Sequence, residues 1–242
     1  MHMVMGKSMR SNKLQEEHLF RLLSWLSPSF PVGAYAYSHG LEFAVETGTV
    51  SNPDELSKWI EAVILLGGGR NDAIFFVSAW HAGQDEKYGL ILEIAERAMA
   101  HRSTAELALE TEAQGSAFLR AINSAWENKK FDELMGPVLK ADIPIAYPVV
   151  VAVAMVSSGI PLKFGLVAYL HAFVSNLVSA GMRLIPLGQS AGQKVLSDLQ
   201  GKVQEAAVNA ENRTLDDLGS TAPVIDWASS NHETQYTRLF RS

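Results

Sequence analysis

The spacing of apolar residues constrains this chain more than any other feature, because most of the sequence repeats them every three or four residues. In the segment SNPDELSKWIEAVILLGGG, one helical face collects Leu56, Trp59, Ile60, Val63 and Ile64. The sequence has no convincing strand-like alternation, and short β-branched runs such as VVVAV also occur in helices. We therefore predict an all-α fold, a single-domain bundle of roughly ten or more helices.

Capping residues, prolines and glycines predict where the helices begin and end. Asn52 is placed to cap a helix that Pro53 opens. The triple glycine Gly67–Gly69 is predicted to end that helix, so that Asn71 starts the next one. Pro161 is predicted to open a long apolar helix.

A second capping pattern precedes the segment that starts near residue 103. Ser103 and Glu106 stand at the spacing of a capping box. Further along the same segment, Glu110 and Glu112 are predicted to lie on a solvated face.

The length of 242 residues suits one large domain or two small ones. We predict a flexible leader over residues 1–18, an all-helical domain over 19–226, and a C-terminal partner-binding tail over 227–242 that belongs to the same domain. The most apolar region, residues 143–187, is broken before it reaches the roughly 20 residues of a membrane span. It is therefore predicted to supply core helices.

Composition excludes several kinds of site. The chain has no cysteine, which rules out disulfides, thiolate zinc sites and cysteine nucleophiles. Its seven histidines show no metal-binding spacing; His171 is predicted to be a hydrogen-bonded core residue, and His2 lies in the methionine-rich leader. No metal or cofactor is predicted. The formal net charge of −6 argues against nucleic-acid binding.

One segment matches a catalytic pattern. GQSAG, residues 188–192, has the G-x-S-x-G form in which a hydrolase places its serine between a strand and a helix. Here the preceding residues read as a helix end and a proline turn, so we favour a helix start capped by Ser190 or Gln189. A serine hydrolase that uses Ser190 is kept as the alternative function.

Residues 27–42, SPSFPVGAYAYSHGLE, are unusual for a connection between two helices. Prolines restrict the backbone, and Gly33 permits a tight turn. Phe30, Tyr35 and Tyr37 add large rings, which are frequent in binding hot spots. Two interpretations stay open: a shaped platform for a partner or second copy, or rings that fill the core beside the turn.

Three segments together resemble the urease accessory protein UreF family. They are LLSWLSPSFPVGAYAYSHGLE with the downstream ETGTV, RLIPLGQSAGQ, and the ending SSNHETQYTRLFRS. HRSTAELALETEAQGSAFL also fits, so the resemblance covers nearly all of the chain after about Leu19.

The resemblance implies a non-enzymatic assembly factor of the cytoplasm that forms a homodimer. Proteins of this kind bind UreD, called UreH in some organisms, and recruit the GTPase UreG. The complex helps to insert nickel into apo-urease, and the UreF subunit modulates GTP hydrolysis by UreG. Neither nucleic acid nor membrane is an expected partner.

The resembling segments supply the candidate dimer or partner contacts, and no catalytic residue is assigned. Arg183 is predicted either to complement a helix end or to meet a partner carboxylate. Tyr236, Leu239 and Phe240 are spaced as one helical face for UreD, or for docking on the domain itself. The full set is Phe30, Tyr35, Tyr37, His39, Glu42, Arg183, Gln189, Ser190, Gln193, His232, Tyr236, Arg238, Leu239, Phe240 and Arg241.

Overall fold

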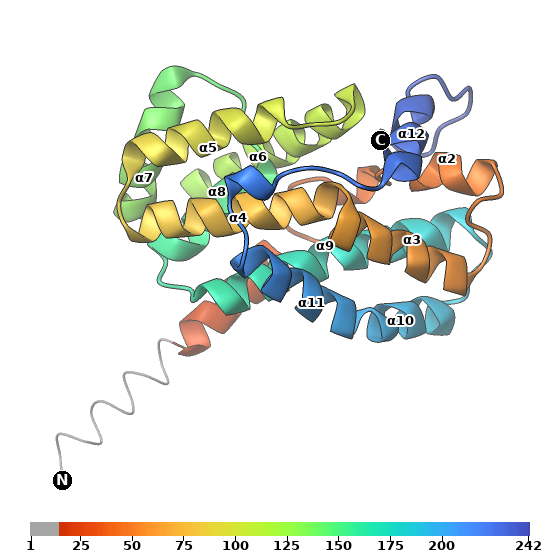
Figure 1. The fold of residues 1–242 in the computed structure, drawn as a ribbon. Coiled ribbons are helices and arrows are strands. Elements are labelled where there is room, and N and C mark those ends of the chain that lie inside the picture. Colours follow the sequence, from red (N-terminus) through yellow and green to blue (C-terminus); the bar gives the residue numbers. More distant parts are fainter. Residues whose placement is uncertain (1–14) are drawn as a thin grey trace, which may run out of the picture.

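The computed structural model describes residues 15–242, in which every regular element is a helix. After a helix over residues 15–25 come the 3-10 turn η1 (Ala34–Ala36) and the helices α2 (Leu41–Glu46), α3 (Pro53–Leu66), α4 (Gly68–Gln84), α5 (Tyr88–Ala100), α6 (Ala105–Ala125), α7 (Lys129–Ala141), α8 (Tyr147–Ser157), α9 (Leu162–Leu184), α10 (Gln189–Asp198) and α11 (Gln200–Glu211). The turn η2 (Leu215–Asp217) and α12 (Pro223–His232) complete the chain (Figure 1). The all-α prediction is confirmed.

The leader predicted over residues 1–18 lies mostly outside the described residues. Its last four residues, 15–18, belong to the first helix.

The core is built around α4 and α8, which pack directly against each other. Every residue of α8 from Pro148 to Val156 is buried. A helix that is apolar on all sides has no face to offer to water, so it must be covered by neighbours. Here α4, α6 and α7 supply that cover, and Figure 1 shows α4 running through the middle of the fold.

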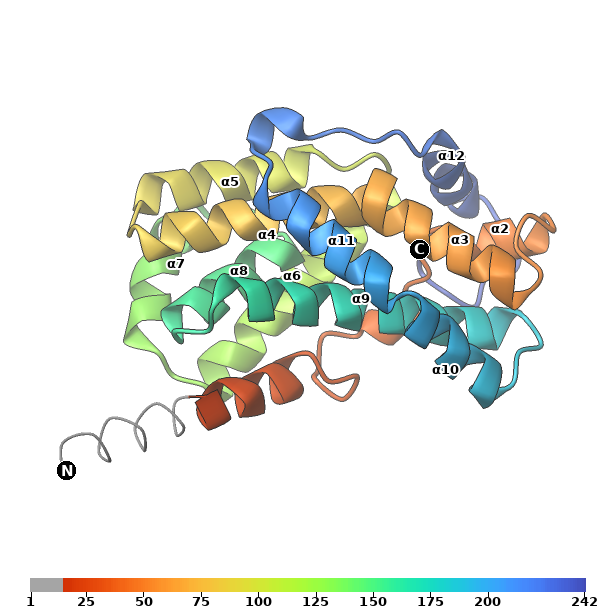
Figure 2. The ribbon, with the colours of Figure 1, turned by 60° about the horizontal axis from the view of Figure 1, so that its bottom comes forward.

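The long helix α9 forms the second half of the core. Its apolar stretch, with a mean hydropathy of 1.4, is long enough to cross a membrane by length and composition alone. Half of that stretch is buried inside the fold, where α9 packs against α3, α4, α10 and α11. Figure 2 shows α10 and α11 lying across it. This packing accounts for its apolar character as that of a core helix.

The predicted start of α3 is confirmed, whereas that of α4 is wrong. The side-chain oxygen of Asn52 accepts a hydrogen bond from the backbone N–H of Glu55 at 3.0 Å. However, α4 begins at Gly68 and not at Asn71. A Cβ at Gly69 would lie 3.1 Å from the backbone of α3, so this glycine serves close helix packing. Asn71 instead accepts a hydrogen bond from the N–H of Gly219 at 3.1 Å.

The capping box predicted at Ser103 is also wrong. Thr104 caps α6, and its hydroxyl accepts a hydrogen bond from the N–H of Leu107 at 3.2 Å. The helix therefore starts one residue later than predicted, and Glu106 no longer stands at capping-box spacing from the cap residue. The solvated face predicted for Glu110 is wrong as well, because Glu110 is buried.

The GQSAG segment starts a helix, as predicted, but neither Ser190 nor Gln189 caps it. Gly188 holds the cap position of α10, without a side-chain hydrogen bond. The preceding regular element is α9, so the strand–turn–helix arrangement of a hydrolase nucleophile does not occur here.

Close packing at Gly115 of α6 gives a test of the fold. A Cβ at this position would collide with the backbone carbonyl oxygen of Ile145. We expect Gly115→Ala to lower the free energy of unfolding by about 2–3 kcal/mol, because backbone cannot move aside as cheaply as a side chain. Chemical denaturation followed by circular dichroism measures this change.

Gly201 of α11 provides the matched control, since a Cβ there meets no atom within 4 Å. Gly201→Ala should leave stability unchanged or raise it by up to about 1 kcal/mol. Equal effects of the two substitutions would contradict the packing described at Gly115.

Candidate interaction site at the C-terminal tail

The chain after α12 folds back onto its own domain. Residues 233–242 are not helical, so the helical face predicted for Tyr236, Leu239 and Phe240 is wrong. The backbone N–H of Arg241 donates to the carbonyl oxygen of Ala36 at 2.8 Å. These residues, 233–242, are called the tail below, and Figure 1 marks their end beside α2 and α12.

One carboxylate on α2 holds the tail. Glu42 is 7 % exposed and accepts hydrogen bonds from the backbone N–H groups of Leu239 at 2.6 Å and Phe240 at 2.9 Å. It also lies 3.0 Å from Nε2 of His232. Two consecutive backbone amides of the tail therefore bind this one side chain, which makes Glu42 an anchor of the tail.

The fully buried His232 connects Glu42 to α6. Its Nδ1 lies 2.7 Å from Oε2 of Glu106. A neutral imidazole has only one N–H donor, so hydrogen bonds between both ring nitrogens and carboxyl groups need either an imidazolium ring or one protonated carboxyl group. In both cases these three side chains hold one more proton than a neutral ring with two carboxylates would. Burial raises the pKa of Glu106, and this effect outweighs the opposite influence of His232 and Arg238.

Two more tail contacts complete the cluster. Nη1 of Arg238 lies 2.7 Å from Oε1 of Glu106, and the hydroxyl of Ser242 donates to Oε2 of Glu110 at 2.7 Å. Three buried carboxylates from α2 and α6 therefore hold the last residues of the chain. We call Glu42, Glu106, Glu110 and His232 the tail cluster.

Arg183, in the last turn of α9, fixes the other side of the tail. Its Nη2 donates to the backbone oxygen of Tyr35 at 2.7 Å, and its guanidinium carbon lies 4.2 Å from the ring centroid of Phe240. Phe240 is 3 % exposed. Partial burial lowers the pKa of Arg183. The guanidinium thus joins the loop before α2, the end of α9 and the tail.

The outer side of this region is apolar. Tyr236 is fully exposed, Tyr35 is 69 % exposed and Leu239 is 62 % exposed. Trp227 of α12 is 53 % exposed and packs edge-on against Phe43 of α2. Large exposed rings beside an ordered backbone are typical of protein-binding surfaces. We call Tyr35, Trp227, Tyr236 and Leu239 the tail surface.

The chain matches a known protein family over most of its length. The UreF family model matches residues 50–200 of the chain. The "Urease accessory protein UreF" of Granulibacter bethesdensis is 46 % identical over 224 residues, which cover 93 % of this chain and 94 % of that protein. The proteins of the same name from Bradyrhizobium diazoefficiens and Rhodopseudomonas palustris (strain BisB5) are each 45 % identical, covering 93 % and 94 % of this chain and 91 % and 93 % of theirs. The chain belongs to the UreF family.

Most of the sequence-predicted contacts of this UreF-family chain meet at the tail. The structure brings together Tyr35, Tyr37, His39, Glu42, Arg183, His232, Arg238, Leu239, Phe240 and Arg241. Tyr37 is buried, and its carbonyl oxygen accepts a hydrogen bond from Asn176 of α9. Phe30 lies apart from the tail cluster and packs against Phe118, with ring centroids 5.3 Å apart. Gln189, Ser190 and Gln193 lie on α10 and are exposed.

Sequence reasoning missed two members of the tail cluster, Glu106 and Glu110. Together with Gln114 they recur every four residues on one face of α6, and all three are buried. The amide of Gln114 donates to Glu110 at 3.1 Å. Polar residues that recur every four positions on one helical face are the signal that could have identified them.

A small polar cavity lies next to the tail cluster. His39 and Glu110 border it, with Nδ1 of His39 3.6 Å from Oε2 of Glu110. The ion pair of Arg102 with Asp72, at 2.6 Å, forms another part of its wall. Its volume of about 20 Å³ is far below the roughly 300 Å³ of a small-molecule site. These buried polar groups therefore support the fold and do not form a substrate pocket.

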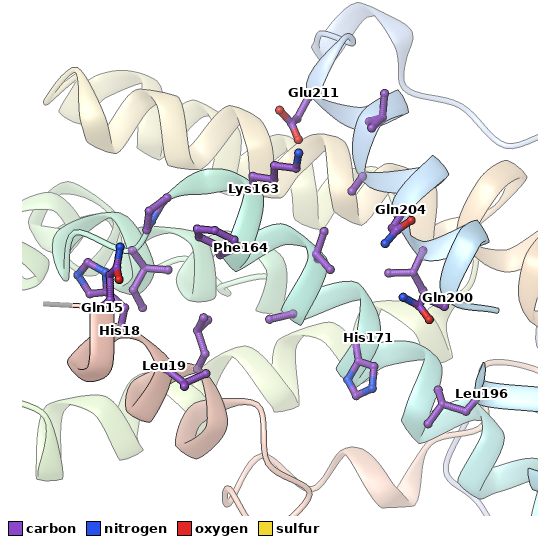
Figure 3. A pocket seen from close by; sticks show the side chains of 18 of the residues that line it. Gln15, His18, Leu19, Lys163, Phe164, His171, Leu196, Gln200, Gln204 and Glu211 are labelled. Carbon is purple, nitrogen blue, oxygen red and sulfur yellow. The ribbon is translucent and has the colours of Figure 1, made fainter. Parts of the chain in front are cut away.

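A second, much larger hollow lies on another side of the UreF-family fold. Figure 3 shows it bordered by the helix over residues 15–25, by α9 and by α10–α11. His171 lines it and is exposed, so the prediction of a buried core histidine is wrong. Among residues 15–242, no group of three or more His, Asp or Glu side chains is placed to hold a metal ion.

The role of Glu42 can be tested through the tail it anchors. We expect Glu42→Gln to speed hydrogen exchange at the amides of Leu239 and Phe240 by at least about tenfold, because the neutral amide is a weaker acceptor and brings a donor to one side. Native-state hydrogen exchange measures this rate. The control is Glu46→Gln on the exposed side of the same helix, which should leave both amides protected. Unchanged protection in Glu42→Gln would contradict the anchoring role.

Proposed function

We propose that this chain is a urease accessory scaffold that bridges UreD (UreH) and the GTPase UreG during GTP-dependent nickel insertion into apo-urease. In this proposal it works in the cytoplasm as a homodimer, modulates GTP hydrolysis by UreG, and makes or breaks no covalent bond itself. Membership of the UreF family supports the proposal, and so do its relatives, which are named urease accessory proteins.

The single observation that supports this role most is the way the tail is held. Glu42 fixes the backbone at Leu239 and Phe240, while the Leu239 side chain stays 62 % exposed. Ordering a segment before it binds removes part of the entropy cost of association. The tail surface is therefore a ready-made contact for another protein, and we assign it to UreD.

The buried polar groups of the tail region fit a structural role better than a catalytic one. Both ring nitrogens of His232 are engaged by carboxyl groups of the same chain. Glu106 is shared between His232 and Arg238, and Glu110 is bound by Ser242. Groups that satisfy one another in this way stabilise a backbone conformation, whereas a catalytic acid or base must reach a substrate.

The tail surface gives a direct test of partner binding. We expect Tyr236→Ala combined with Leu239→Ala to weaken UreD capture by about 10- to 30-fold, because exposed rings and aliphatic side chains carry most of such contacts. Titration of UreD against the purified variants measures the loss. Leu139→Ala, an equally apolar exposed site on α7 at the opposite end of the fold in Figures 1 and 2, should bind normally. Normal capture by the Tyr236/Leu239 variant would remove the tail surface from the proposal.

The alternative hydrolase function has its own test at Ser190. We expect the unchanged chain to resist labelling by a serine-directed phosphonate. Mass spectrometry after exposure to the phosphonate checks the labelling. A phosphonate adduct on Ser190, together with ester turnover that Ser190→Ala abolishes, would establish the hydrolase.

A further inference from the structure

His232 is a buried histidine with a carboxyl group at each ring nitrogen. Its Nε2 lies 3.0 Å from Oε2 of Glu42 on α2, and its Nδ1 lies 2.7 Å from Oε2 of Glu106 on α6. The histidine is fully buried, and each of the two glutamates is only 7 % exposed. The ring therefore meets oxygen atoms on both sides, whereas a neutral imidazole has a hydrogen for only one of them.

Loss of one proton from this group would leave two acceptors facing each other. A lone pair of the ring would then lie 2.7 Å or 3.0 Å from a carboxylate oxygen, with no hydrogen between them. With the proton, the formal charges of His232, Glu42, Glu106 and Arg238 cancel, and without it one negative charge remains. An uncompensated buried charge is costly, so the docked tail holds the proton.

The tail binds the same two carboxyl groups. The backbone N–H groups of Leu239 and Phe240 donate to Glu42, and Nη1 of Arg238 lies 2.7 Å from Oε1 of Glu106. When the tail lifts, these partners leave and water reaches the carboxyl groups in their place. Water supplies its own donors and weakens the repulsion between charges, so the opened state does not need the proton. An exposed histidine loses it above about pH 6.5.

Other charged groups face this region from the neighbouring elements. Glu110 on α6 lies 3.6 Å from His39, which precedes α2. Glu233 follows the buried ring in the chain and is exposed. Arg183 of α9 and Arg241 of the tail stay charged at every pH considered, because an arginine is not deprotonated in proteins. Among residues 15–242, the nitrogens of the buried ring form side-chain hydrogen bonds with the two carboxyl groups of α2 and α6 alone.

We propose that docking of the tail is linked to a proton: the docked tail keeps one proton shared among His232, Glu42 and Glu106, and opening releases it. Above about pH 6.5 the docked state binds one proton more than the opened state. Docking therefore weakens as the pH rises, and the effect approaches a factor of about ten per pH unit. Below about pH 6.5 both states hold the proton and the dependence disappears. The inference concerns this chain alone and does not depend on the proposed function.

The electrostatics of Glu106 have the same sign. Burial raises the pKa of this carboxyl group. A group whose pKa is raised in the folded state contributes stability at low pH and loses that contribution as the pH rises. The carboxyl group and the ring that it contacts therefore both favour the docked tail at the acidic side of neutrality.

Hydrogen exchange of the unchanged chain measures the link, under conditions in which the tail closes faster than its amides exchange. The exchange rates of the Leu239 and Phe240 amides are each divided by the intrinsic rate at the same pH. We expect this ratio to rise about five- to tenfold between pH 7 and pH 8, because opening releases one proton. A ratio that stays constant over this range would overturn the inference.

Glu106→Gln removes the need for the proton and keeps every contact. Its amide oxygen accepts from Arg238, and its N–H donates to Nδ1 of a neutral His232, whose Nε2–H then remains for Glu42. We expect this variant to keep the tail docked and to change its ratio less than twofold between pH 7 and pH 8. The matched control is Glu233→Gln, which removes the same charge nearby but no contact with the ring, and should keep the full dependence. Full dependence in Glu106→Gln would overturn the inference.

His39 is the other histidine near the tail, and His39→Asn tests its share. Asparagine tolerates the left-handed backbone of this position, where φ is 57°. We expect the variant to keep the five- to tenfold change in the ratio, a result that holds its value even if Glu106→Gln does not fold. Loss of the dependence in His39→Asn would assign the proton to His39 and overturn the role of His232.

Discussion

The conformation of the tail depends on the buried carboxylate of Glu42. It binds two consecutive backbone amides of the tail and the imidazole of His232, and these groups come from chain positions about 190 residues away. A carboxylate taken out of water is costly unless hydrogen bonds replace its hydration. The tail supplies those bonds, so the domain and the tail stabilise each other.

The three segments that resemble the UreF family meet at this place. The loop before α2 provides the backbone oxygen of Tyr35, the end of α9 provides Arg183, and the tail provides Phe240. The rings of residues 27–42 therefore divide between the two roles that the sequence left open, core packing and partner contact. Tyr37 is buried in the domain, whereas Tyr35 is exposed on the tail surface. One turn serves both the core and a surface available to a partner.

The tail surface and the large hollow are formed by different side chains. Side chains of η1, α12 and the tail form the first, while the first helix, α9, α10 and α11 border the second. Helix α9 connects the two regions, because Arg183 at its end donates to the backbone oxygen of Tyr35 and the first half of the helix lines the hollow.

The sequence by itself determined the helical class, the start of α3 and the core placement of α8, because apolar spacing and local capping act within a few residues of chain. It also marked the segments that form the tail region. Only the tertiary structure decided that Glu106 and Glu110 are buried and that Phe240 turns inward while Leu239 stays outside. Those outcomes depend on hydrogen bonds between residues more than 100 positions apart, which no local pattern records.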